Sequence, residues 1–203
     1  VEIEKFKKFK IDRVKNDKIN LITVARFSEK KKGFDLVPEL LVKLIELKLD
    51  FHWNIIGKNT KELFKKDIIK KNSDKFTIID DLIDFDETYL PSTHLINKYM
   101  CSDIYLNLSR IESFGITFIE ALASGIPVIS FDTKGVNEII KNQYNGYIIE
   151  GNKLDSIAKK IFEIAYDRSL IKILEVGMVN SSKNYDLNLV TNKFLDLYKI
   201  LLK

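Results

Sequence analysis

Residues 104–131 read IYLNLSRIESFGITFIEALASGIPVISF, and this stretch decides the fold. It opens with the largely apolar run 104–108 and closes with a second one, 127–131, each as long as a buried strand. Between them, residues 115–124 follow a helical pattern that ends at Gly125 and Pro127. A strand, a helix and a second strand in this order predict a parallel βαβ unit.

Four further segments are short, apolar and bounded by turn residues, as buried parallel strands are: 20–25, 52–56, 76–79 and 147–149. Helical patterns separate most of the strands, at 35–49, 61–71, 94–100 and 136–140, and follow the last one, at 155–165, 170–179 and 187–201. We expect Asp35 to cap the first of these helices and Pro38 to lie in its first turn. The alternation predicts an α/β fold, a doubly wound Rossmann-like parallel sheet of about six strands with helices on both faces.

The length of 203 residues suits one well-buried domain. We expect this domain to span residues 19–180. Residues 1–18 are highly charged and begin with Val1 rather than an initiator methionine, so we predict an interdomain linker there with sequence before it. Residues 181–203 are predicted to form a C-terminal helix. This helix has more apolar side chains than a single buried face requires. Such a helix packs either towards a missing N-terminal domain or wholly on this one.

Composition excludes several classes of protein. The net charge of +4 makes no case for a dedicated nucleic-acid binder. One cysteine and two histidines, His52 and His94, without acidic or thiol partners at ligand spacing predict no metal site. No apolar run approaches the ~20 residues that cross a bilayer, so the expected location is the cytoplasm. The excess of lysine over arginine, with many isoleucines and asparagines, indicates a bacterial, AT-rich genome.

Ligands of doubly wound sheets bind beyond the carboxyl ends of the strands, near the point where the strand order reverses. The loops to consider are therefore 26–34, 57–60, 80–88, 109–114 and 132–135. The strongest signal is a pair of glutamates, Glu112 and Glu120, on either side of a strand-to-helix turn. Gly115 opens the helix, so its amide and those of Ile116 and Thr117 form an anion site at the positive end of the helix dipole.

Glu120 lies within the apolar helix and needs a partner, for which ribose hydroxyls, a nearby lysine and water are the alternatives. Two cations, Arg26 and Lys32, follow the first strand at the same edge of the sheet. They suit a diphosphate, because arginine binds phosphate as a fork and lysine as a point charge. The alternative is that the lysine run is simply solvated.

Residues 112–131, with GVNE at 135–138 and NGY at 145–147, closely resemble the group 1 retaining glycosyltransferases of GT-B fold. The resemblance covers residues 19–149 in the correct motif order and includes the arginine and the Lys-Gly pair after the first strand. It implies that the chain is the C-terminal, donor-binding half of a GT-B enzyme of polysaccharide or glycoconjugate biosynthesis. Departures from the common pattern at Ala25, Asp81 and Leu108 leave the base and sugar of the donor open.

The resemblance also implies roles for single residues. Arg26 and Lys32 match the pair that grips the donor diphosphate, and Glu120 matches the glutamate that binds its ribose. Glu112 and the following backbone match the segment that holds the transferred sugar and distal phosphate, and the base is expected near the loop after strand 76–79. The segment residues are Ser113, Phe114, Gly115 and Ile116, and the loop residues are Leu82 and Ile83.

The implied donor is a nucleoside-diphosphate sugar, most often a UDP-sugar, with no cofactor and no metal. The implied partner is an N-terminal domain that holds the acceptor, so we expect this chain to bind nucleotide without transferring sugar alone. The full-length protein is expected in the cytoplasm, with peripheral contact at the inner face of the plasma membrane as an open alternative.

Other interpretations stay open. Asp84-Phe85-Asp86 matches the Asp-x-Asp with which glycosyltransferases of the other major fold hold a divalent cation. A nucleotide-sugar epimerase or phosphorylase shares the two-domain shape. A non-catalytic nucleotide-binding or receiver-like module shares the sheet, although a receiver needs clustered acids where Arg26 stands.

Overall fold

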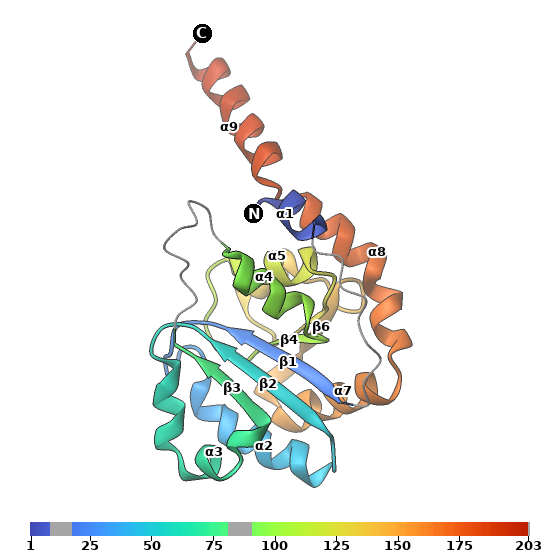
Figure 1. Cartoon of the computed structure of the whole chain (residues 1–203). Helices are drawn as coiled ribbons and strands as arrows, with labels where there is room; N and C mark the ends of the chain where they lie inside the picture. Colours follow the sequence, from blue (N-terminus) through green and yellow to red (C-terminus); the bar gives the residue numbers. More distant parts are fainter. Residues whose placement is uncertain (9–17, 81–90, 203) are drawn as a thin grey trace.

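The strands and helices form one parallel sheet with helices on both faces (Figure 1). The computed structural model describes residues 1–8, 18–80 and 91–202. Within these residues, six strands lie in the order β3-β2-β1-β4-β5-β6, and every neighbouring pair is parallel. They are β1 (Ile19–Val24), β2 (Phe51–Ile56), β3 (Phe76–Ile79), β4 (Ile104–Asn107), β5 (Val128–Phe131) and β6 (Gly146–Ile149). The predicted doubly wound α/β fold is confirmed.

The helices cover the sheet in two layers. The α-helices between and after the strands are α2 (Val37–Glu46), α3 (Asp67–Lys71), α4 (Thr93–Met100), α5 (Ile116–Ala123), α6 (Lys134–Ile139), α7 (Leu154–Tyr166) and α8 (Ser169–Lys183). Short 3₁₀ turns are η1 (Phe34–Leu36), η2 (Thr60–Lys65), η3 (Ser73–Lys75) and η4 (Glu150–Asn152). Helices α2 and α7 pack together on one face, and α5 packs against α4 and α8 on the other (Figure 1).

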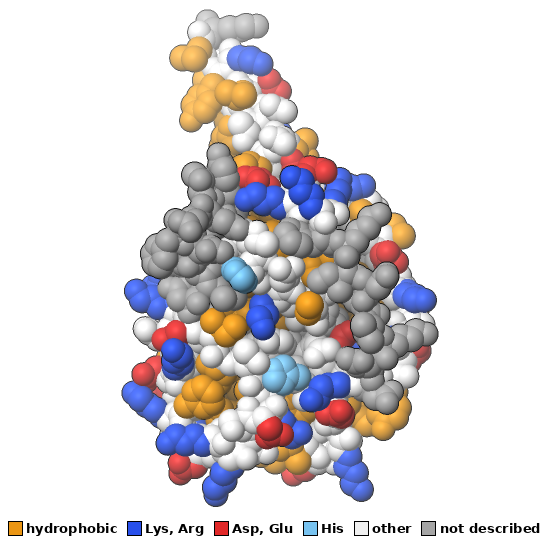
Figure 2. Space-filling view, viewed as in Figure 1, with side chains coloured by type: hydrophobic (Ala, Val, Ile, Leu, Met, Phe, Trp, Pro, Cys, Tyr) orange, Lys and Arg blue, Asp and Glu red, His pale blue; other side chains and the backbone are white. Residues whose placement is uncertain are grey.

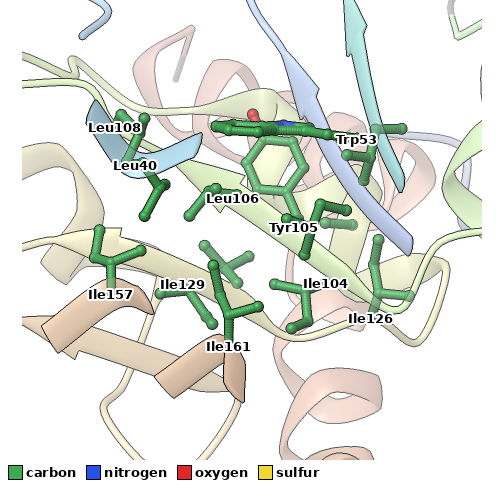
Figure 3. Packing of buried hydrophobic residues seen from close by; sticks show 14 of the residues in the cluster. Leu40, Trp53, Ile104, Tyr105, Leu106, Leu108, Ile126, Ile129, Ile157 and Ile161 are labelled. Carbon is green, nitrogen blue, oxygen red and sulfur yellow. The ribbon is translucent and has the colours of Figure 1, made fainter. Parts of the chain in front are cut away.

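The apolar periodicity of α7 explains how its layer forms. Its buried side chains recur at helical spacing, and the side chains of β4 and β5 are all buried. Figure 3 shows side chains from α2, β4, β5 and α7 gathered in this layer, among them Leu40, Leu106, Ile129, Ile157 and Ile161. A strand buried on both faces can therefore expose only its ends, which directs function to the loops.

The predicted helix 61–71 is interrupted. Lys66 is extended (φ −85°, ψ 119°) and separates η2 from α3. Leu63 and Ile69 are both fully buried. On one continuous helix, two residues six apart point about 120° away from each other. The break at Lys66 lets both side chains face the core.

The two ends of the chain differ in their packing. The segment expected to be a linker contains a short helix, α1 (Ile3–Lys7), whose Ile3 and Phe6 are buried. Helix α9 (Leu187–Leu201) buries no side chain and projects from the body of the domain (Figure 1). Hydrophobic side chains line the projecting helix in Figure 2, while cationic and anionic side chains are interspersed over the face shown there. Among the described helices, none has the length and apolar character to cross a bilayer.

Candidate functional site

The order of strands reverses between β1 and β4, which are neighbours in the sheet although β2 and β3 separate them in sequence. Strand β1 ends at Val24 and β4 at Asn107. The loops 25–33 and 108–115 therefore leave the same edge of the sheet side by side. This is the point at which doubly wound sheets bind ligands.

Two glycines bring the backbones of these loops into contact. Gly33 has a positive φ of 71°, and a Cβ at this position would lie 2.0 Å from the Leu108 carbonyl oxygen. Gly135, at the start of α6, packs in the same way, since its Cβ would lie 2.2 Å from the Glu112 carbonyl oxygen. Real Cβ atoms do not approach carbonyl oxygens so closely, so glycine is required at both positions. Three loops of the carboxyl edge are thereby held together.

Arg110 joins the same loops through its side chain. Its guanidinium donates to Asp35 Oδ1 at 2.7 Å and to Asp35 Oδ2 at 3.0 Å, a bidentate pair. It also donates to the Lys30 carbonyl at 2.8 Å, and the Arg110 amide donates to the Lys31 carbonyl at 3.1 Å. Arg110 thus fixes the cationic loop after β1 to the loop after β4.

The prediction that Asp35 caps α2 is wrong. The N-cap residue is Leu36, and no side chain caps the helix. Asp35 lies in the 3₁₀ turn before the helix, and its carboxylate binds Arg110. The carboxylate accepts two charge-assisted hydrogen bonds from one guanidinium in bidentate geometry, which accounts for the preference. Sequence reasoning missed Arg110 as a site residue, and the available signal was a lone arginine inside a loop already singled out.

Lys32 and Glu112 meet directly. Lys32 Nζ lies 2.7 Å from Glu112 Oε2, and their side chains keep 24% and 13% of their surface exposed. The two predicted site residues come from the loops after β1 and β4, as the fold requires. The pair is therefore half-buried at the point where the strand order reverses.

Arg26 follows β1 and is exposed. Its side chain forms no hydrogen bond or ion pair with the parts of the chain that the structure describes. An exposed guanidinium at the same edge of the sheet as the Lys32–Glu112 pair is available to an anionic ligand.

The segment after Glu112 leads into α5, with Gly115 as its N-cap. The amides of Ile116 and Thr117 lie in the first turn, where no intrahelical acceptor exists. Ser113 and Ile116 are exposed, and the Phe114 ring packs edge-on against Tyr185 with centroids 5.6 Å apart. Exposed residues therefore surround the turn at the positive end of the helix.

Glu120 lies deeper, one turn further along α5, and keeps only 7% of its surface exposed. Burial raises the pKa of this carboxyl group to about 7, while a hydrogen bond from Tyr99 and the positive N-terminus at Val1 oppose the shift. The Tyr99 hydroxyl donates to Glu120 Oε2 at 2.8 Å. The protein partner of Glu120 is thus a tyrosine of α4, which was not among the predicted alternatives of ribose hydroxyls, a lysine and water.

Two predicted site residues, Leu82 and Ile83, lie outside the described residues, as do Asp84 and Asp86 of the Asp-x-Asp alternative. Within residues 1–8, 18–80 and 91–202, no three His, Cys, Asp or Glu side chains are grouped as metal ligands are.

Comparison with known families decides the identity of this arrangement. The family model for "Glycosyl transferases group 1" matches residues 4–184. The chain belongs to the group 1 glycosyltransferases. A Klebsiella pneumoniae relative, described as an uncharacterized 41.2 kDa protein in the cps region, is 30% identical over 164 residues, which are 80% of this chain and 40% of the relative.

Solved structures have the same fold as this glycosyltransferase domain. A glycosyltransferase from Rickettsia africae ESF-5 has a TM-score of 0.79 and 25% identity, over 100% of this chain and 56% of that one. Anabaena Alr3699/HepE in complex with UDP and glucose has a TM-score of 0.73 and 15% identity, over 90% of this chain and 48% of that one. The chain spans about half the length of these proteins and corresponds to the C-terminal domain of the GT-B fold.

Proposed function

We propose that this chain is the donor-binding domain of a retaining glycosyltransferase. It binds a nucleoside-diphosphate sugar and stabilises the leaving diphosphate while the sugar moves to an acceptor. The observation that carries this proposal is the meeting of Lys32 and Glu112 beside the N-terminus of α5, where the strand order reverses. Arg26 is exposed at the same edge of the sheet.

The diphosphate is the part of the donor that the described residues suit best. Arg26 supplies a forked donor and Lys32 a point charge, and the amides at the start of α5 add fixed partial charge. Lys32 already has a carboxylate partner in Glu112 at 2.7 Å. A bound diphosphate takes over this lysine and leaves Glu112 for the hydroxyls of the transferred sugar.

The ribose is proposed to bind at Glu120. This carboxylate is nearly buried and has one described hydrogen-bond donor, Tyr99. Buried carboxylates require donors, and a vicinal diol supplies two. The base is placed against Leu82 and Ile83, and the donor is proposed to be a UDP-sugar. The complex of Alr3699/HepE with UDP and glucose supports this choice of nucleotide.

In the proposed reaction, the acceptor hydroxyl attacks the anomeric carbon from the face of the leaving group, and the configuration is retained. Negative charge grows on the departing diphosphate as the glycosidic bond breaks. The helix fixes the α5 amides, and once Arg26 and Lys32 bind the diphosphate they stabilise this charge as it develops. Donor binding through these cations is expected to persist in EDTA.

The acceptor is proposed to bind a separate N-terminal domain. On this proposal the chain alone binds nucleotide and does not transfer sugar. The exposed apolar side chains of α9, including Phe194 and Leu197, are proposed to pack on that domain. The complete enzyme is placed in the cytoplasm, acting in bacterial polysaccharide or glycoconjugate synthesis, with peripheral contact at the inner face of the plasma membrane.

Thermal unfolding with UDP, GDP and ADP in EDTA tests the proposal. A nucleotide at ~100 times its Kd should stabilise the chain by about 2.7 kcal/mol. For a chain of this size that is a rise in Tm of about 5–10 °C. Glu120→Ala should lose most of the rise, whereas Glu175→Ala, an exposed glutamate on α8, should keep it. A Tm that no nucleotide changes would contradict the proposal.

A further inference from the structure

Tyr99 and Glu120 form a buried pair that lies outside the ligand-binding loops. Tyr99 belongs to α4 and is fully buried, and its hydroxyl donates to Glu120 Oε2 at 2.8 Å. The described residues offer no hydrogen bond to the other oxygen, Oε1. One oxygen of the carboxylate is therefore fixed, and the other has an acceptor site without a donor among the described residues.

The position of Tyr99 is itself constrained. Its ring stacks on Tyr105 of β4 with centroids 6.0 Å apart and an interplanar angle of 27°. The Tyr105 hydroxyl does not reach Glu120. It lies 3.1 Å from the Val24 carbonyl and 2.8 Å from the Thr117 hydroxyl. Of these two stacked tyrosines, only Tyr99 orients the carboxylate.

We propose that Tyr99 is a positioning residue of the nucleotide site, which holds Glu120 so that its Oε1 accepts hydrogen bonds from the ribose hydroxyls. This inference rests on the proposed function and extends it to a residue of α4. A side chain whose rotamer is fixed by packing and by a second hydrogen bond binds a ligand without a further ordering cost.

Tyr99 also affects the ionisation of Glu120. Only the ionised carboxylate accepts at both oxygens, and burial opposes ionisation of Glu120. The groups that face it are Tyr99 from α4, Tyr105 from β4 and the N-terminal ammonium of Val1. The buried face of α8, which packs on α5, contributes no ionisable side chain: Leu174, Gly177, Met178, Ser181 and Ser182. Tyr99 is thus the one hydroxyl among them that stabilises the charged form by a direct hydrogen bond.

The test compares UDP with 2′,3′-dideoxy-UDP by titration calorimetry in three chains: unmodified, Tyr99→Phe and Tyr105→Phe. Hydrogen bonds to a charged group contribute about 1.5–3 kcal/mol, so the unmodified chain should prefer UDP by at least about tenfold. Tyr99→Phe should reduce this preference at least about fivefold and leave the Kd for the dideoxy nucleotide within about twofold. Tyr105→Phe removes a buried hydroxyl from the same stack and should keep the preference.

The pH dependence of the preference provides a second measurement. In the unmodified chain the preference for UDP should grow as pH rises through about 7, and Glu120→Gln should abolish both the preference and its pH dependence. In Tyr99→Phe the midpoint should move to higher pH, because the bond that favours the ionised form is lost.

The outcomes separate the inference from the proposed function. Absence of UDP binding by the unmodified chain, or equal binding of both nucleotides, contradicts the proposed nucleotide site and the inference with it. A preference that survives in Tyr99→Phe overturns the inference alone. Equal weakening of both nucleotides in Tyr99→Phe, or loss of the preference in Tyr105→Phe as well, assigns Tyr99 a packing role and also overturns it.

Discussion

Lys32 and Glu112, 80 residues apart in the chain, form an ion pair of 2.7 Å across the point where the strand order reverses. Neither side chain is fully exposed, so the pair is more than a solvated surface contact. In the proposed function the two residues bind successive parts of one donor. The pair keeps both side chains at the carboxyl edge of the sheet before the ligand arrives, and the ligand must then separate them.

Glu112→Gln should therefore strengthen the binding of UDP. It should also reduce the additional affinity that the sugar gives to UDP-glucose. The amide does not compete for Lys32 as a carboxylate does, and surface and half-exposed pairs contribute up to about 1 kcal/mol, or about fivefold in Kd. Calorimetry with UDP and UDP-glucose measures both effects. Glu29→Gln, which removes the exposed Glu29–Lys66 pair of 2.9 Å, is the matched control and should change neither Kd. Weaker UDP binding in Glu112→Gln would contradict this account of the pair.

Arg110→Ala and Asp35→Ala should each weaken UDP binding about tenfold without contact to the ligand, because the cationic loop loses its anchor on the loop after β4. The double variant should bind UDP about as weakly as either single variant. In unfolding by urea, the two substitutions should show a coupling energy of about 0.5–3 kcal/mol. The Lys43–Asp155 pair, also 2.7 Å, joins α2 to α7 and serves as the control cycle. Additive effects of Arg110→Ala and Asp35→Ala would show that the bidentate pair does not position the loop.

The sheet was predictable from sequence because its strands are buried on both faces and differ from the helices in apolar periodicity. Each predicted strand boundary lies within one residue of the observed one. The helix prediction for 61–71 was wrong at Lys66, where the burial of both Leu63 and Ile69 outweighs the local preference for a continuous helix. Tertiary packing overrides propensity at such positions.

The site was predictable in part for a similar reason. The carboxyl ends of parallel strands lie at one edge of the sheet, so the loops that follow them begin there. Lys32 and Glu112 therefore had to lie at the same edge. The partners of Asp35 and Glu120 could not be predicted, because Arg110 and Tyr99 are 75 and 21 residues away and no periodicity encodes either contact. A capping role for Asp35 was the best local interpretation, and a non-local pair replaced it.

Stability should depend on pH through Glu120. Its pKa is raised from 4.5 to about 7 in the folded chain, chiefly by burial, so between these values the folded state holds a proton that the unfolded state has released. The resulting stabilisation is fully present below pH 4.5 and is lost as pH rises to about 7. At about 1.36 kcal/mol per pKa unit, the loss is on the order of 3 kcal/mol. The free energy of unfolding relative to Glu120→Gln, measured in urea across this range, should fall by this amount, and a constant difference would refute the linkage.

Arg26→Ala and Lys32→Ala should each lower the rate of transfer about 10²–10³-fold in the proposed two-domain enzyme. Both cations are proposed to act on charge that develops only as the diphosphate leaves. Lys31→Ala changes an exposed lysine next to Lys32 in the chain and should leave the rate within about twofold, since a solvated charge contributes little. Steady-state rates with a radiolabelled donor measure all three, and a rate for Lys32→Ala close to that of Lys31→Ala would exclude the proposed role.

Gly33→Ala should destabilise the chain more than Gly151→Ala, although both glycines have nearly the same backbone conformation, with φ of 71° and 70°. Alanine pays about 1–2 kcal/mol for left-handed backbone at either position. At Gly151 the nearest atom to an added Cβ is 3.6 Å away, in the flexible Lys153 side chain, so little else changes. At Gly33 the Cβ would lie 2.0 Å from the Leu108 carbonyl oxygen, so the loop that contains Lys32 must move away from the loop after β4. Overpacking of this kind costs about a further 1–3 kcal/mol.

Thermal unfolding should report the difference in stability, and UDP titration should report weaker binding in Gly33→Ala alone. Equal effects of the two substitutions would mean that the close approach at Leu108 does not hold the two loops together.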